Sequence, residues 1–224
     1  MNVKINKKLH DELCKLEYKE YIFGSHLHGI ATEASDRDFI RVVRDDFYER
    51  FSSLAKYYPN IHSFQYDDVD SNSQYVWLTK KQFYHNLFSG DGNMIADVVL
   101  LSGEFEDALH LTRTYKIIKA YLGVAKRDLK MHPNCKKKRF HARRSLMMAW
   151  ALMSGELPKV STIKLLKILP EKTTRELLDR EKRYRVILNS KLDSGLITHY
   201  PVMKESDTLA QVMADCNNIR EFKY

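Results

Sequence analysis

The chain has 224 residues, of which 44% are hydrophobic and 11% aromatic, enough for one sizeable core or two small ones. A charged fraction of 29%, and the lack of any apolar run near the roughly 20 residues that a spanning helix needs, argue against a membrane protein. The formal net charge of +8 favours anionic partners such as nucleotides or nucleic acid, with simple solubility as the alternative.

The start of the chain and its cysteines indicate a compartment. The opening stretch "MNVKINKKLHDEL" lacks the continuous apolar core of a signal peptide. Cys14, Cys135 and Cys216 are widely spaced and odd in number, which favours reduced thiols over a disulfide framework. We therefore expect a cytoplasmic protein, or one of the host cytoplasm if the gene belongs to a phage.

The N-terminal half alternates strand and helix patterns. Leu9, Leu13 and Leu16 form one apolar stripe, which predicts a surface helix within residues 5–19. Hydrophobic segments bounded by turn residues predict strands at 21–23 and 36–43. Residues 63–70 and 74–78 predict a further strand pair, or one strand with a break. A helix is expected to begin after Thr79, a capping residue, and to end at the Gly90-Asp91-Gly92 turn.

The C-terminal half is helical in pattern. Long helical periodicities cover residues 104–129, 136–157 and 173–195, and Pro133 breaks the first from the second. The Met- and Trp-rich stretch "SLMMAWALM" at 145–153 predicts helical core. Strands early and helices late indicate an α+β fold, in which residues 1–103 form a lobe with a small mixed sheet flanked by helices and residues 104–224 form a helical lobe.

The segment "YIFGSHLHGIATEASDRDFIRVV" at 21–43 carries the strongest chemical signal. The turn at Gly24 and Ser25 offers backbone N–H groups and a hydroxyl to phosphate oxygens. Asp36 and Asp38 are two apart on a predicted strand, so both project to one face, where carboxylates can hold Mg²⁺. Alone, such a pair is also typical of a solvated strand edge, and its coupling to the Gly-Ser turn is what favours a site.

This segment resembles the hallmark of the DNA polymerase β-type nucleotidyltransferase superfamily. With Gly29, Ser35 and Arg41 it is most similar to the YcgL or RlaP-type predicted nucleotidyltransferases of bacteria and phages, some of which lie beside RNA-repair genes. The stretches "TKKQFYHNLF" and "GNMIADVVL", the latter with Asp97, resemble further motifs of that group, as do "AYLGVAKRDL" and "KKKRFHARRSLMMAWALMSGEL" in the helical lobe. The resemblance spans roughly residues 20–185.

The resemblance implies a role for each matching residue. Gly24 and Ser25 are expected to contact the triphosphate, and Asp36 and Asp38 to bind Mg²⁺, with two ions possible and Mn²⁺ able to substitute. The family places a third acidic residue on a strand shortly before the Lys-Phe helix, and we expect Asp70 there as third catalytic and metal-binding carboxylate. Asp68 and Gln74 are the alternatives, and Gln74 would put efficient turnover in doubt.

The basic cluster at the start of residues 136–157 is the last candidate. Lys138, His141 and Arg144 recur every three residues, so they share one helical face and match the family signature for nucleotide contact. A solvated helix start is the alternative. The expected function is Mg²⁺-dependent transfer of a nucleoside monophosphate from a nucleoside triphosphate to a hydroxyl of RNA or tRNA; a protein acceptor, or a nucleotide- or RNA-binding module with weakened catalysis, is the alternative.

Overall fold

The computed structural model describes residues 2–43, 63–90 and 93–201, and it confirms the α+β fold class. The chain divides into two compact units. The described residues of the first unit are 2–26, 31–43 and 63–86, and those of the second are 27–30, 87–90 and 93–201. The domain boundary expected after residue 103 stays a prediction, and the second compact unit begins at Leu87 with residues 27–30 added to it.

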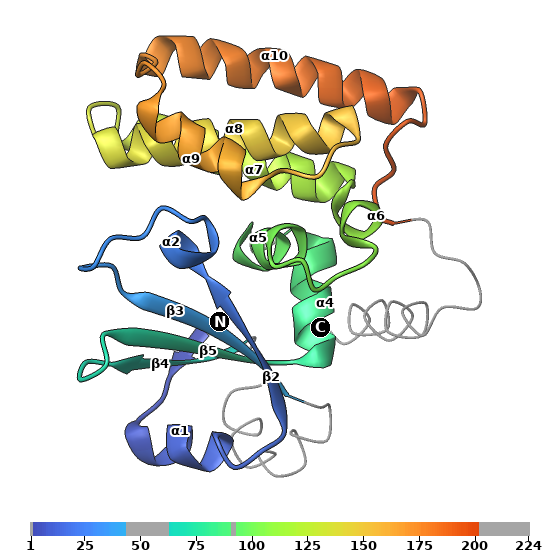
Figure 1. Cartoon of the computed structure of the whole chain (residues 1–224). Helices are drawn as coiled ribbons and strands as arrows, with labels where there is room; N and C mark the ends of the chain where they lie inside the picture. Colours follow the sequence, from blue (N-terminus) through green and yellow to red (C-terminus); the bar gives the residue numbers. More distant parts are fainter. Residues whose placement is uncertain (1, 44–62, 91–92, 202–224) are drawn as a thin grey trace. The chain divides into compact units, whose positions relative to one another are not determined.

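The first unit is built on a five-stranded mixed sheet with the order β1-β4-β5-β3-β2 (Figure 1). The central strands β5 and β3 are parallel, while β3 and β2, like β5 and β4, are antiparallel. At the edge, β1 runs parallel to β4. The strands are β1 Asn2–Lys4, β2 Tyr18–Phe23, β3 Arg37–Val43, β4 Ser63–Asp68 and β5 Ser73–Thr79.

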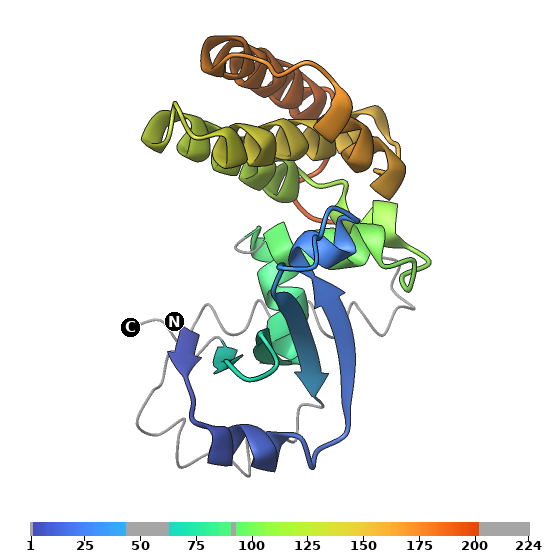
Figure 2. The ribbon, with the colours of Figure 1, turned by 60° about the vertical axis from the view of Figure 1, so that its left-hand side comes forward.

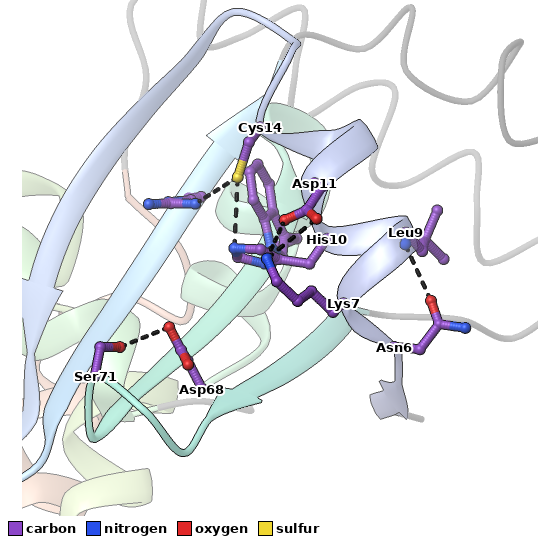
Figure 3. A network of polar contacts seen from close by, with 10 residues as sticks. Asn6, Lys7, Leu9, His10, Asp11, Cys14, Asp68 and Ser71 are labelled. Carbon is purple, nitrogen blue, oxygen red and sulfur yellow. Dashed lines mark hydrogen bonds and ion pairs between the residues drawn. The ribbon is translucent and has the colours of Figure 1, made fainter.

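Helix α1, Lys7–Leu13, covers one face of the sheet. The Asn6 side chain caps it by accepting from Leu9 N, and Leu13 packs into a buried cluster with Trp77 and other core residues. His10 accepts from Trp77 Nε1 at 3.3 Å, and this polar network is shown in Figure 3. The helix is shorter than the periodicity over 5–19 predicts, because the chain must leave it to begin β2 at Tyr18.

The opposite face carries alternate residues of the same strands and faces α4, Lys80–Ser89. Tyr21 of β2 stacks on Phe83 with ring centroids 5.8 Å apart. The helix begins as predicted after Thr79, whose hydroxyl accepts from Gln82 N while the Gln82 side chain accepts from Thr79 N. Strand alternation therefore decides which side chains meet α1 and which lie on the face of α4.

The second unit is helical, and in it α7, α8 and α10 lie side by side (Figure 2). Thr114 and Thr173 cap α7 and α10, and Gly155 ends α8 in the left-handed conformation. Most of the segment 145–153 is core as predicted, but Trp150 is 45% exposed. The helices are α5 Asn93–Leu101, α6 Ala108–Thr112, α7 Tyr115–Met131, α8 Lys136–Ser154, α9 Val160–Ile168 and α10 Thr174–Asp193.

The described residues bear on the expectations about membrane spans and cysteines. Of the helices in these ranges, none combines the length and apolar character needed to span a membrane. Cys14 and Cys135 are free and exposed, while Cys216 lies outside the described residues.

Candidate functional site

The two ends of the segment 21–43 meet in the structure. Strand β2 ends at Phe23, which pairs with Asp38 of β3, and Gly24 begins the short helix α2, Gly24–Leu27. A Cβ added to Gly24 would lie 2.2 Å from Asp38 Oδ2, and Gly24 has a φ of +66°, which favours glycine. Any side chain here would displace the carboxylate, so glycine allows the backbone turn to lie against Asp38 as it does.

The two aspartates of the segment interact electrostatically. Asp38 is half-buried at the start of β3, and Asp36 is exposed just before the strand. Burial, followed by the charge of Asp36, raises the pKa of Asp38 to about 6, against the opposing effect of His26. Two carboxylates that disfavour each other's charge are an arrangement that a divalent cation would relieve.

The two residues after Gly24 have buried polar atoms without hydrogen-bond partners in the described part of the chain. Ser25 Oγ and His26 Nε2 are buried atoms without a hydrogen-bond partner among the described residues. A buried hydroxyl without a partner costs free energy unless a ligand or water completes it. The Ser25 hydroxyl therefore has the character expected of a group that meets a phosphate oxygen.

The position beside Asp38 on the neighbouring strand belongs to Gln74. Parallel pairing of β3 and β5 sets Asp38 opposite Gln74, and antiparallel pairing of β5 and β4 sets Gln74 opposite Asp67. Partnered residues share a face, so Asp38, Gln74 and Asp67 form a row across three strands. Strand β5 directly precedes α4, so Gln74, one of the alternatives to Asp70, lies on the strand before that helix. Which of Asp68, Asp70 and Gln74 fills the third position of the family stays a prediction.

Asp67 is held tightly by its neighbours. Its Oδ1 accepts from the amides of Gln74 and Gln65, each at 3.0 Å, and Lys4 Nζ lies 2.8 Å from its Oδ2. These contacts, with the Gln65 hydrogen bond first and that of Lys4 next, lower the pKa of Asp67 to about 2. The strand pattern at 63–70 did not single out Asp67, because its place beside Gln74 depends on the register of β4 with β5.

The other acidic candidates lie elsewhere. Asp70 is exposed in the turn between β4 and β5, and the structure does not bring it into the row of Asp38 and Gln74. Asp68 belongs to the face of α1, where it accepts from the Ser71 hydroxyl at 2.7 Å (Figure 3). The role expected for Asp70 stays a prediction. Arg41 of the family signature also belongs to the α1 face, where its guanidinium lies 4.2 Å from the Tyr75 ring centroid.

The side chains near Gly24 decide which metal ion the site could hold. Within residues 2–43, 63–90 and 93–201, no group of three or more His, Cys, Asp or Glu side chains is gathered for a metal ion. Mg²⁺ is commonly held by one or two carboxylates together with substrate phosphates. Asp38, which lies against the Gly24 backbone and interacts electrostatically with Asp36, fits this kind of ion together with Asp36, with the phosphates as the remaining ligands.

A second polar cluster is buried in the helical unit. Asp97 of α5 accepts from Tyr121 at 2.6 Å and lies 2.9 Å from His28 Nε2, while Arg144 Nη1 lies 3.0 Å from His28 Nδ1. Because arginine only donates, His28 Nδ1 accepts and Nε2–H donates to Asp97. Burial favours the neutral acid, but the His28 hydrogen bond and the Arg144 charge bring the pKa of Asp97 below its ordinary value.

The three residues predicted to form the basic face of α8, Lys138, His141 and Arg144, have neighbours that change their charge or hold their side chains. Arg144 is tied to His28, and its Nε is buried without a partner in the described part of the chain. Lys138 Nζ lies 3.8 Å from Asp128, a buried residue of α7. Burial, then the charge of Arg144, lowers the pKa of His141 to about 4, so this imidazole is neutral at neutral pH and could serve a phosphate only as a neutral donor.

Comparison with known proteins gives a distant structural similarity. No protein-family model matches the chain, and no curated protein matches it. Among solved structures, the chain is similar to a nucleotidyltransferase-like protein from Exiguobacterium sibiricum 255-15, with 13% sequence identity and a TM-score of 0.31. The similarity covers 97% of this chain and 79% of that protein.

Proposed function

We propose that the protein binds a nucleoside triphosphate with Mg²⁺ at Gly24, Ser25, Asp36 and Asp38, and transfers the nucleoside monophosphate to a hydroxyl of RNA or tRNA. The observation that carries this proposal is the close approach of Gly24 to the Asp38 carboxylate. It joins a turn suited to phosphates with a carboxylate pair suited to a divalent cation. The resemblance of residues 21–43 to polymerase β-type nucleotidyltransferases supports the same reaction.

Each group has a part in that reaction. Bound Mg²⁺ would neutralise charge on the phosphates. The Gly24 backbone approaches a phosphate without a side chain in the way, and the Ser25 hydroxyl donates to a phosphate oxygen. The acceptor oxygen bonds to the α-phosphorus, the bond to the β-phosphate bridging oxygen breaks, and pyrophosphate leaves. The hydroxyl proton passes to a carboxylate, for which Asp70 is the expected residue, or to solvent water.

A second candidate function follows from Gln74. An amide cannot accept the hydroxyl proton as a carboxylate does, and Asp67, the next acid along the row, is engaged by two amides and Lys4. A nucleotide- or RNA-binding module with weak or no turnover is therefore the alternative. Protein adenylylation differs from the main proposal only in the acceptor.

The test separates binding from transfer. Purified protein is incubated with each α-labelled nucleoside triphosphate and Mg²⁺, with total RNA and total cell protein as acceptors, and nucleotide affinity is measured in parallel by titration calorimetry. We expect nucleotide binding that needs Mg²⁺ and label transfer to RNA. The double substitution Asp36→Asn and Asp38→Asn should weaken both by at least roughly 100-fold, as a lost metal site does.

The controls assign the outcome to the site. Asp70→Asn tests the carboxylate in the turn: loss of transfer with binding retained would make Asp70, and not the Gln74 position, the third group. Asp179→Asn, an exposed acid of α10 paired with Lys182, should change neither quantity. Transfer that survives loss of both Asp36 and Asp38 carboxylates would overturn the proposed site, and binding without transfer to any acceptor would select the second candidate.

A further inference from the structure

A cavity of about 450 Å³ opens between α8, α9 and α10, wholly inside the helical unit. Its apolar lining includes Met147, Trp150 and Leu166. Arg143, Lys172 and Arg180 also line it, and none of the described lining residues is acidic. The lining is thus mostly apolar and its charged residues are all basic, which fits a ligand that combines a flat apolar part with an anionic part.

Trp150 is the unusual residue of this cavity. Its neighbours Met148 and Ala149 are fully buried, yet Trp150 is 45% exposed. Its ring stacks on that of Tyr184 from α10, with centroids 5.1 Å apart and planes at 25°. A partly exposed tryptophan backed by a second ring is a suitable surface for another flat ring, because stacking gains from contact of extended π systems.

Two arginines flank the ring pair Trp150–Tyr184. Arg143 precedes Met147 by four residues and Trp150 by seven, so all three follow one stripe of α8. Arg180 precedes Tyr184 by four residues on α10. Within the described residues neither guanidinium has an ion pair or hydrogen bond, whereas Lys172 lies 3.8 Å from Glu176. The charges of Arg143 and Arg180 also act on Glu171 and Glu176, but neither guanidinium is held in an ion pair there. Two guanidinium groups without a direct partner beside a stacking surface favour an anion in this cavity.

We propose that this cavity binds single-stranded nucleic acid, with a base stacked on Trp150 and backbone phosphates at Arg143 and Arg180. A polynucleotide repeats a flat base and a phosphate in every unit, which matches a ring pair between two cations; an acidic peptide supplies the charge without the ring. The inference deepens the proposed function and rests on it in one respect: RNA, the proposed acceptor, is the expected nucleic acid.

Binding is tested without triphosphate or Mg²⁺, so that it is independent of transfer. Fluorescence anisotropy of end-labelled RNA of about 12 nucleotides is compared with DNA of the same sequence and with duplex RNA. Trp150→Ala should weaken RNA binding roughly 5- to 100-fold, and Trp150→Phe should retain most of it because a ring remains. Substituting Arg143 and Arg180 together by Ala should lower the salt slope by about 1.4, for two phosphates on a single strand.

A spectroscopic signal reports the stacking directly. The chain has 2 tryptophans, of which Trp77 is 1% exposed, so a ligand that quenches emission should act on Trp150. RNA should quench wild-type emission and leave that of Trp150→Phe unchanged. Arg175→Ala and Val186→Ala, exposed positions of α10 outside the cavity, are the matched controls and should bind RNA like the wild type.

Three outcomes would overturn the proposal: equal RNA affinity of wild type and Trp150→Ala, competition by polyglutamate as strong as by RNA, or tighter binding of duplex RNA. DNA bound more tightly than RNA would contradict RNA as the ligand. Trp150-dependent RNA binding with no nucleotidyl transfer would uphold this inference while the proposed function fails. Transfer to RNA, together with equal RNA affinity of wild type and Trp150→Ala, would do the reverse.

Discussion

At the scale of single residues, Gly24 offers the most direct test of the site. Gly24→Ala should shift the Asp38 carboxylate, because the added Cβ would lie 2.2 Å from its Oδ2. The left-handed backbone adds about 1 kcal/mol of strain. We expect a loss of about 2 kcal/mol or more in free energy of unfolding, measured with urea, together with at least roughly tenfold weaker Mg²⁺-nucleotide binding, since a displaced carboxylate loses its ligand geometry.

The chain contains a matched control for this substitution. Gly103 has a φ of +75° with nothing within 4 Å of an added Cβ, so Gly103→Ala should show the backbone strain alone. Combining Gly24→Ala with Asp38→Ala removes the collision, and the two effects should be non-additive. Equal costs at Gly24 and Gly103, with additive effects at Gly24 and Asp38, would contradict a required contact between the turn and the carboxylate.

Asp97 provides a second prediction at this scale. Asp97→Asn replaces one carboxylate oxygen by an amide donor that faces another donor from His28 or Tyr121. Breaking a buried, hydrogen-bonded charge in this way should lower the free energy of unfolding by about 3 kcal/mol. Tyr121→Phe, which removes one hydrogen bond, should cost about 1.5 kcal/mol. If both variants unfold at the wild-type urea midpoint, the cluster is not a stabilising element of the helical unit.

At the scale of secondary-structure elements, the pairing of β5 with β3 decides which residue lies beside Asp38. Gln74→Asp would put a carboxylate at that position, where it could accept the acceptor's proton. If wild-type turnover is limited by the missing base, label transfer to RNA should rise by roughly 100-fold. Asp67→Asn is the control, because it alters the charge of the row without supplying a base. A rise in Asp67→Asn alone would instead indicate that the Asp67 charge is inhibitory.

The elements also explain how much of the site was predictable. Local patterns were sufficient for the Gly24 turn, the strand that carries Asp38 and the start of α4, since each depends on neighbouring residues. The third position depends on register between β5 and its neighbours, which a single strand pattern does not contain; the structure places Gln74 beside Asp38 and leaves Asp70 in a turn. The link between His28 and Asp97 joins residues 69 apart, so no local spacing could indicate it.

At the scale of the whole molecule, a buried histidine in the first unit and a half-buried histidine in the second make the free energy of unfolding depend on pH. Burial, then the charge of Arg41, lowers the pKa of His10 in the first unit, and burial with Arg144 lowers that of His141 to about 4 in the second. Asp128 acts in the opposite direction on His141, and Lys138 in the same direction as Arg144. Both units should therefore lose stability as acid charges imidazoles that the fold keeps neutral.

The direction in which the free energy of unfolding changes with pH follows from proton uptake by His141. Between about pH 6.5 and pH 4 the unfolded chain binds more protons at His141 than the folded chain does. The contribution of His141 to the free energy of unfolding is therefore fully present above about pH 6.5 and is lost as the pH falls. Because solvent screens the half-exposed His141 ring, the free energy of unfolding should fall by only about 1 kcal/mol from pH 7 to pH 5. His141→Gln should reduce this loss in urea unfolding, while His132→Gln, at an exposed position after α7, should not. An unchanged pH dependence in His141→Gln would mean that the acid sensitivity arises elsewhere, with His10→Gln as the next variant to measure.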